Sequence, residues 1–221
     1  MNCIKKCILA IVFATCLHAY GLKQNNDIQT IKNTIMSDIE NRLDFDLLDK
    51  FAERTVRTDF IGEFVNYRWS FTDESGTEIR LFGDTRSHFT MWEPPPKPAF
   101  HQIFREFHSS GYLKEIGKLM GSVTEIGIWK YFDEAGNLIK TVDEDKKFGK
   151  FGYNELLLFL HQQGYINLET GENRKGARFG YNVETGQWDV SVRVGAWLTR
   201  YVIDGETGEV LSKEGPSPII R

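Results

Sequence analysis

The feature that most constrains the fold is a strand-turn-strand pattern that recurs along the chain with a glycine at the turn. In its clearest copy, residues 126–142, two runs of aromatic and β-branched residues flank the polar sequence Asp-Glu-Ala-Gly at residues 133–136. Such runs favour β-strands. Glycine adopts the left-handed conformation that closes a hairpin loop of four or five residues. We therefore predict a β-hairpin here, with Gly136 in the left-handed position.

A second copy of the pattern precedes the first. Residues 103–113 and 128–138 share isoleucine, an aromatic residue, a basic residue and phenylalanine, followed by glycine and leucine at the same spacing. A short hairpin cannot bury a face alone, so repeated hairpins gain stability by stacking on one another. We therefore expect the two copies to lie in one stack of hairpins.

Two motifs carry a family resemblance in this region: Gly127-x-Trp129-x-Tyr131-x-Asp133-x-x-Gly136-x-Leu138, preceded by Glu106-Phe107-x-x-x-Gly111-x-Leu113-Lys114. They resemble MORN-repeat variants, the short β-hairpin repeats of bacterial proteins often labelled as antitoxin components. The resemblance covers about residues 100–143. It implies an interaction scaffold and assigns no catalytic residue.

Upstream of the repeat, the apolar period is first helical and then strand-like. Apolar residues three or four positions apart predict an N-terminal helix: Ile28, Ile31, Ile35, Ile39 and Leu43. A second amphipathic piece, residues 47–56, continues this helix or forms a short one of its own. Residues 60–92 predict an antiparallel meander. The proline-rich residues 93–98 then form either a rigid crossover between strands or a polyproline segment that a partner recognises.

The C-terminal third predicts a smaller unit of one helix and an antiparallel sheet. Asn154 is the predicted helix cap and Gly164 the predicted end. Three strand-turn units with an identical Glu-Thr-Gly turn follow, at residues 169–171, 184–186 and 206–208. In the last of these turns, we expect side-chain to backbone hydrogen bonds from Asp204 and Thr207.

This third also carries a resemblance, based on the helix, on Trp188-x-Val190-x-Val192 and on Tyr201-x-Ile203-Asp204-x-x-Thr207-Gly208-x-Val210-Leu211. These elements resemble a PepSY-type module over about residues 153–213. PepSY modules are small α+β units of exported bacterial proteins. The resemblance implies that the unit binds or restrains a partner, which in some members is a protease.

The N-terminus predicts export. Two lysines precede an apolar run at residues 7–17, and the small residues Ala19 and Gly21 follow. This order is typical of a secretory signal peptide, and the run is about half the ~20 residues that span a membrane. We expect cleavage between residues 19 and 21 and a periplasmic or secreted protein. A degenerate lipobox makes a lipid anchor at Cys16 the alternative.

Composition excludes several kinds of site. All three cysteines lie within residues 1–21, so the exported chain would have no disulfide or thiolate site. Removal of the two lysines in this segment changes the formal charge from −4 to about −6 and leaves no basic block. We therefore predict no binding of nucleic acid, which needs a clustered positive surface.

Motifs for catalysis, metals and cofactors are missing from the sequence. The histidines lack partners at zinc-binding spacing, and neither a Gly-x-Ser-x-Gly nor a P-loop motif occurs. Ser87, His88 and Asp84 have the residue types of a hydrolytic triad, but neighbours on a strand point to opposite faces. We predict no enzyme activity, no metal and no cofactor.

Trp129 and Tyr131 are the predicted binding residues. If Ile128 and Phe132 face the core, strand alternation turns Trp129 and Tyr131 towards solvent or the second unit, and both residue types are preferred anchors of interfaces. We expect a non-catalytic envelope protein that binds another protein, with an immunity-like or inhibitor-like role. The alternatives are an envelope hydrolase with a site between the two units and a structural component of an envelope assembly.

Together these patterns predict an α+β protein. The predicted organisation is a signal peptide at residues 1–21, an N-terminal helix with a β-hairpin domain at 22–147, and a PepSY-like domain at 153–221.

Overall fold

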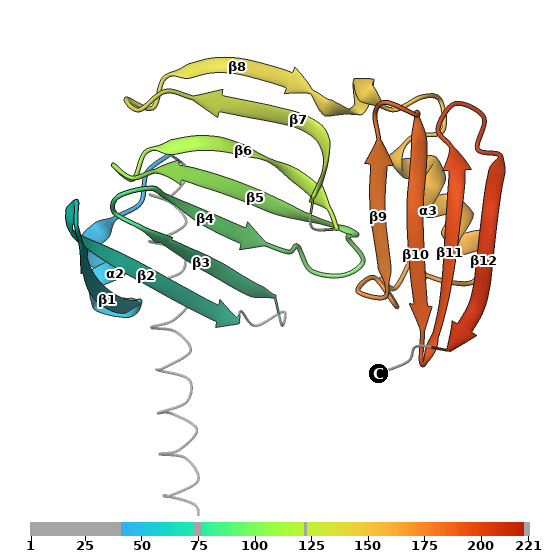
Figure 1. Ribbon diagram of the computed structural model, residues 1–221, viewed down its shortest axis with the longest axis horizontal. Coiled ribbons are helices and arrows are strands. Elements are labelled where there is room, and N and C mark those ends of the chain that lie inside the picture. Colours follow the sequence, from blue (N-terminus) through green and yellow to red (C-terminus); the bar gives the residue numbers. More distant parts are fainter. Residues whose placement is uncertain (1–40, 73–76, 122, 219–221) are drawn as a thin grey trace, which may run out of the picture.

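A computed structural model describes residues 41–72, 77–121 and 123–218 of the chain. These residues form two antiparallel sheets, of eight and four strands, with two α-helices and one 3-10 helix (Figure 1). The predicted α+β class with an N-terminal helix is therefore wrong, because antiparallel strands dominate the fold. The helix expected from residue 28 lies mostly outside the described residues, and residues 41–43 are not helical.

The eight strands of the larger sheet pair in strict sequence order, so the sheet is one continuous meander. Its strands are β1 (Glu53–Asp59), β2 (Gly62–Thr72), β3 (Glu78–Asp84), β4 (His88–Glu93), β5 (His101–His108), β6 (Leu113–Met120), β7 (Thr124–Phe132) and β8 (Leu138–Asp143). Residues 53–56, expected to be helical, belong to β1, because the whole strand pairs with β2.

Helix α2 (Phe45–Phe51) covers part of one face of this sheet. The Asp44 carboxylate caps the helix by accepting hydrogen bonds from the backbone N–H groups of Asp46 and Leu47 (2.9 and 3.1 Å). Its apolar side packs with the strands in a buried cluster formed by Leu43, Leu48, Tyr67, Ile79, Leu81, Phe89, Met91, Phe107 and Leu113.

The two copies of the repeat close with the same turn. The Gly111 N–H donates to the carbonyl of His108 (2.9 Å), and the Gly136 N–H donates to that of Asp133 (3.0 Å). Both glycines are left-handed, with φ of +87° and +83°. The predicted hairpin and the predicted role of Gly136 are confirmed.

The second unit follows the 3-10 helix η1 (Glu144–Lys147). It contains α3 (Tyr153–Gln162) and the strands β9 (Ala177–Asn182), β10 (Gln187–Val194), β11 (Trp197–Asp204) and β12 (Val210–Pro218), in the order β12-β11-β10-β9. Leu156, Leu157 and Leu160 of α3 pack on one face of this sheet. The predicted cap was wrong: Gly152 precedes the helix, and its N–H donates to the Glu155 carboxylate (3.0 Å).

The three Glu-Thr-Gly turns share one hydrogen-bond pattern. The side chains of Asn167, Asn182 and Asp204 each accept from the backbone N–H groups two and three residues further on. Thr207 Oγ1 also donates to Asp204 (2.9 Å), which confirms the predicted role of these two side chains.

The two units are in contact. Arg174, in the segment before β9, donates to the carbonyls of Pro95 and Ala99 in the proline-rich connection between β4 and β5 (3.0 and 3.2 Å). Met120 and Ile126, at the near ends of β6 and β7, belong to the apolar cluster that includes α3.

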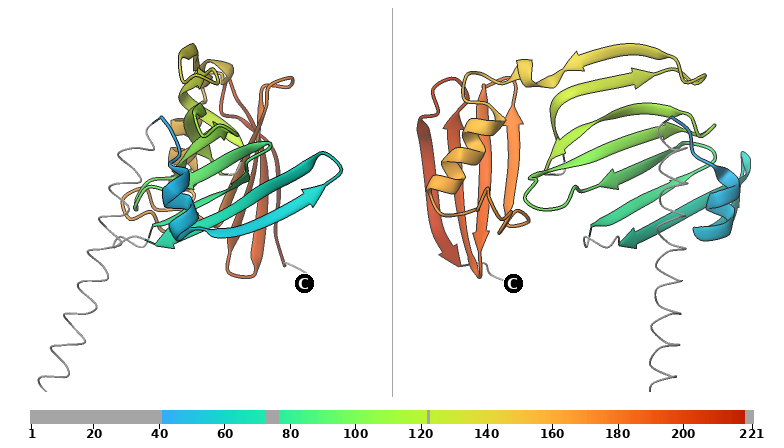
Figure 2. Two further views of the ribbon diagram at one scale, coloured as in Figure 1. Left: turned by 90° about the vertical axis from the view of Figure 1, so that its left-hand side faces the viewer. Right: turned by 180° about the vertical axis from the view of Figure 1, so that it is seen from behind.

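Helices α2 and α3 lie on the same side of the molecule, as the opposite views in Figures 1 and 2 show. The other face of each sheet therefore looks towards the opposite side. Within the described part of the chain, no helix has the length and hydropathy that crossing a bilayer requires.

Candidate functional site

Five aromatic side chains form a row on the face of the eight-stranded sheet opposite α2. We call this row the aromatic strip, and its members are Phe82, Trp92, Phe104, Trp129 and Tyr131. Successive ring centroids are 4.6, 5.5, 5.9 and 6.4 Å apart. Aromatic pairs interact favourably at these separations. The strip is therefore one continuous row of packed rings from β3 to β7, within which Trp129 is buried.

Strand register and one glycine place the rings. Trp92 and Phe104 lie directly opposite each other on β4 and β5, and Gly117 of β6 is the next residue in this row. A Cβ atom at Gly117 would lie 2.2 Å from the indole ring of Trp129. Glycine at this position of β6 therefore leaves the space in which the Trp129 ring lies.

The structure places Trp129 and Tyr131 together on the strip, on the opposite side of β7 from Ile128 and Phe132. Phe132 packs against the α2 cluster, but Ile128 is 53% exposed while Trp129 is 1% exposed. The premise that Ile128 faces the core is therefore wrong. Trp129 also donates from Nε1 to the Lys118 carbonyl (3.3 Å). Tyr131 is half-buried, and the binding role of both residues stays a prediction.

The residues that the sequence reasoning missed are the other members of the strip. Phe82 is 49% exposed, and Trp92 and Phe104 are half-buried. Tryptophans on predicted strands were visible in the sequence. Their alignment was not, because it depends on the pairing register of strands β3 to β7.

Carboxylates gather at the Tyr131 end of the strip. Glu106 and Glu115 lie directly opposite each other on β5 and β6, and Glu115 lies opposite Tyr131 on β7. Glu106 forms an ion pair with Lys114, and Glu125 lies 3.9 Å from Lys147. Among the described residues, the side-chain carboxylate of Glu115 has no hydrogen-bond or ion-pair partner, although the residue is half-buried.

Three pKa values in this group are raised, mainly by burial and in addition by neighbouring carboxylates. Burial and the neighbouring Glu106 raise the pKa of Glu115, and burial and Glu144 raise that of Glu125. Burial together with Glu125, Glu115 and Glu144 raises the pKa of Tyr131 to about 12. The ammonium group of Lys140 lies 5.2 Å from the centre of the Tyr131 ring. This end of the strip therefore suits a cation.

A polar hollow of about 500 Å³ adjoins the other end of the strip at Phe82. Asn66 Nδ2 is buried there and has no hydrogen-bond partner among the described residues. The triad-like residues also line it, but Ser87 Oγ donates to Asp84 (2.7 Å) as part of a turn. His88 hydrogen-bonds with neither, as far as the described residues show. This geometry is that of a turn rather than of an activated nucleophile.

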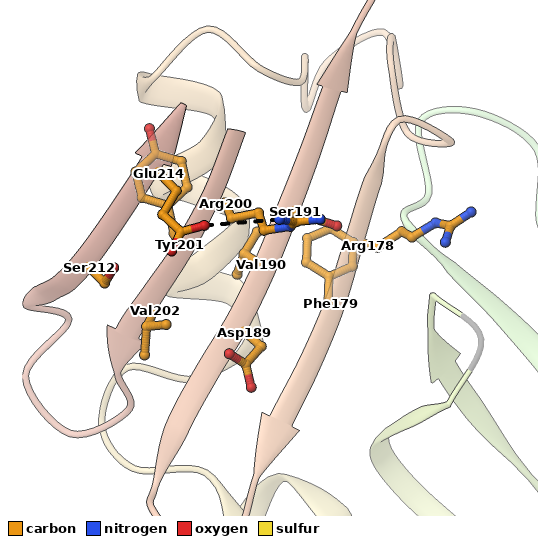
Figure 3. Close-up of a pocket in the computed structure, with 10 residues that line it drawn as sticks. All are labelled: Arg178, Phe179, Asp189, Val190, Ser191, Arg200, Tyr201, Val202, Ser212 and Glu214. Carbon is orange, nitrogen blue, oxygen red and sulfur yellow. Dashed lines mark ion pairs between the residues drawn. The ribbon is translucent and has the colours of Figure 1, made fainter. Parts of the chain in front are cut away.

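A second hollow, of about 300 Å³, lies on the face of the four-stranded sheet opposite α3 (Figure 3). Arg178, Ser191, Arg200 and Glu214 form one row across its strands. Arg200 lies 4.0 Å from Glu214, and both are exposed. Figure 3 shows Arg178 pointing away from the other labelled side chains, so the two guanidinium groups do not converge on one ligand.

Within residues 41–72, 77–121 and 123–218, no group of three or more histidine, cysteine, aspartate or glutamate side chains is arranged to hold a metal ion.

No family model matches the chain, and neither a curated protein nor a solved structure does. The resemblances to MORN-repeat variants and to PepSY modules therefore stay predictions.

Proposed function

We propose that this protein is an exported, non-catalytic binding protein of the bacterial envelope, and that the aromatic strip is the surface with which it binds another protein. The observation that carries the proposal is the continuous row of five rings on the sheet face away from α2. Tryptophan and tyrosine supply much of the binding energy at protein interfaces. An immunity-like or inhibitor-like role is the concrete form of the proposal.

The scaffold beneath the strip also supports a binding role. All eight strands are tied by consecutive antiparallel pairing, so the rings are held in fixed positions before a partner arrives. A preorganised surface loses less conformational entropy on association. The tip of the β1–β2 hairpin offers a further apolar contact, since Phe60 is 97% exposed and Ile61 is 69% exposed.

The contacts between the two units favour binding over the alternative of a hydrolase with a site between them. The described contacts there include packed apolar side chains and hydrogen bonds that Arg174 and Thr124 donate to backbone carbonyls. Neither kind of contact supplies a general base or a nucleophile.

Affinity capture with matched variants tests the proposal. The purified protein, the double variant Phe82→Ser/Trp92→Ser and the control Ile128→Ser are each crosslinked in an envelope extract, and the captured proteins are identified. Ile128 is a suitable control because it is exposed on the opposite face of the sheet. We expect the unchanged protein and the control to capture the same partner and the double variant to lose it. Equal capture by all three would overturn the proposal.

A further inference from the structure

The carboxylate-rich end of the aromatic strip carries an inference about the chemistry of the partner, and this inference rests on the proposed function. We propose that the strip binds an extended, basic segment of another protein, and that a lysine or arginine side chain of this segment places its cation between Glu115 and Glu125, against Tyr131.

The charges at this end of the strip are complementary to a cation. Like charges directly opposite each other on neighbouring strands are unfavourable, and Glu106 and Glu115 are such a pair. Lys114 neutralises Glu106, while Glu115 has no ion-pair partner among the described residues. The ammonium group of Lys114 lowers the pKa of the Glu115 carboxyl, but it is paired with Glu106, and burial still raises this pKa overall. A cation from a partner would neutralise this carboxylate.

An aromatic ring lies beside that carboxylate. The ammonium group of Lys140 already lies over the Tyr131 ring, so the chain itself shows that this ring accepts a cation. A guanidinium group would gain more, because it forms two parallel hydrogen bonds with a carboxylate and stacks on aromatic rings. Glu115 and Tyr131 lie directly opposite each other on β6 and β7, so one side chain of the partner can reach both.

The strip has the length of a short extended peptide. Phe82 lies on β3 and Tyr131 on β7, which are four strand spacings apart. At about 4.8 Å per spacing the strip is roughly 19 Å long. An extended peptide covers this distance with about six residues. Such a peptide would lie across the strands and be recognised by its side chains, with apolar groups on the rings and a cation at the Tyr131 end.

Titration with defined peptides tests the inference. The probe is the six-residue peptide Leu-Ser-Leu-Ser-Arg-Ser, which in an extended conformation presents both leucines and the arginine on one face. Its matched control carries neutral citrulline in place of the arginine. Tryptophan fluorescence of the purified protein reports binding, since Trp92 and Trp129 are members of the strip. We expect the arginine peptide to bind about tenfold more tightly than the citrulline peptide, because charged hydrogen bonds are the stronger ones.

Two charge-matched variants locate the cation. Glu115→Gln should weaken binding of the arginine peptide about tenfold. Glu184→Gln removes the same charge from an exposed turn of the second unit and should leave the affinity unchanged. Circular dichroism of each variant establishes that it is folded before its affinity is compared.

The possible outcomes separate this inference from the proposed function. Equal binding of the two peptides, unchanged affinity of Glu115→Gln, or no binding of the arginine peptide would each overturn the basic-segment inference. A chitin tetrasaccharide is tested in parallel. If this sugar or the citrulline peptide binds, and if the binding is lost in Phe82→Ser/Trp92→Ser, then the strip binds ligands of another chemistry. The affinity capture described above decides independently whether the strip binds a protein at all.

Discussion

The Trp129 ring lies over Gly117 of the neighbouring strand in the eight-stranded sheet. Glycine normally weakens a strand interior, because it has no side chain to pack. Here the indole ring of Trp129 fills the space above Gly117, and the two residues together keep the strip continuous between Phe104 and Tyr131. A residue that looks unfavourable in the sequence is thus required by the position of a ring from the neighbouring strand.

Replacement of Gly117 by alanine should therefore be costly. Its Cβ would lie 2.2 Å from the Trp129 ring, so the ring has to move. We expect Gly117→Ala to lower the free energy of unfolding by about 1–3 kcal/mol, as overpacking does in other proteins. Urea unfolding measures this change. The control is Gly180→Ala, where the nearest atom to the new Cβ is 3.9 Å away; an equal loss in both variants would contradict the account.

Glu115 links stability to pH with a definite sign. Its pKa is raised in the folded protein above the ordinary value of 4.5, mainly by burial. The stability from this group is fully present below the unfolded pKa and is lost as the pH rises through the folded pKa. Glu115→Gln should therefore have a higher Tm than the unchanged protein at pH 7, and the difference should vanish below pH 4.5. A variant that is less stable at pH 7 would show that the carboxylate is compensated.

At the scale of elements, the turns could be predicted from the sequence, but the face of β7 that is buried could not. Gly136, Asp204 and Thr207 act within a few residues of their own position, so their roles could be read from local chemistry. The side of β7 that becomes buried depends on where α2 ends and on which rings cover Trp129. Strand alternation therefore separated Trp129 from Ile128 correctly but assigned the wrong one of them to the core.

The predictions for the helix cap and for the edge strand were wrong for a related reason. Strand β1 is exposed along its whole length, so it shows no alternation of apolar and polar residues, and its pairing with β2 alone makes it a strand. Asn154 was predicted to cap α3, but the cap is Gly152, whose N–H donates a hydrogen bond to the Glu155 carboxylate. Spacing in the sequence cannot decide between two such adjacent caps.

The short helix α2 depends on its cap. Asp44 accepts two hydrogen bonds from the first turn, and α2 has only seven residues. We expect Asp44→Ala to lower the free energy of unfolding by about 1 kcal/mol. Asp44→Asn, which retains an acceptor, should cost less. Chemical unfolding followed by circular dichroism measures both, and identical losses would mean that the cap bonds contribute little.

At the scale of the whole molecule, the proline-rich connection of the larger sheet is hydrogen-bonded to the second unit. It links the neighbouring strands β4 and β5, and two of its carbonyls accept hydrogen bonds from Arg174 of the second unit. The sequence indicated a rigid segment between strands. Its docking against residues far along the chain could not be read from local pattern.

Removal of the Arg174 guanidinium should weaken this junction. Arg174→Ala leaves the carbonyls of Pro95 and Ala99 without their donor, and we expect a loss of about 1–3 kcal/mol in the free energy of unfolding. Lys175→Ala is the matched control, because Lys175 is exposed and adjacent in sequence. If both variants unfold at the same urea concentration as the unchanged protein, the Arg174 bonds do not stabilise the junction.

Site-specific photo-crosslinking in the envelope shows directly whether the aromatic strip binds another protein. A benzophenone amino acid is introduced at Phe82 on the strip or at Ile128 on the opposite face, positions that are 49% and 53% exposed and therefore equally accessible. We predict a discrete crosslinked protein adduct from position 82 and none from position 128. No adduct at position 82, or the same adduct from both positions, would contradict the claim.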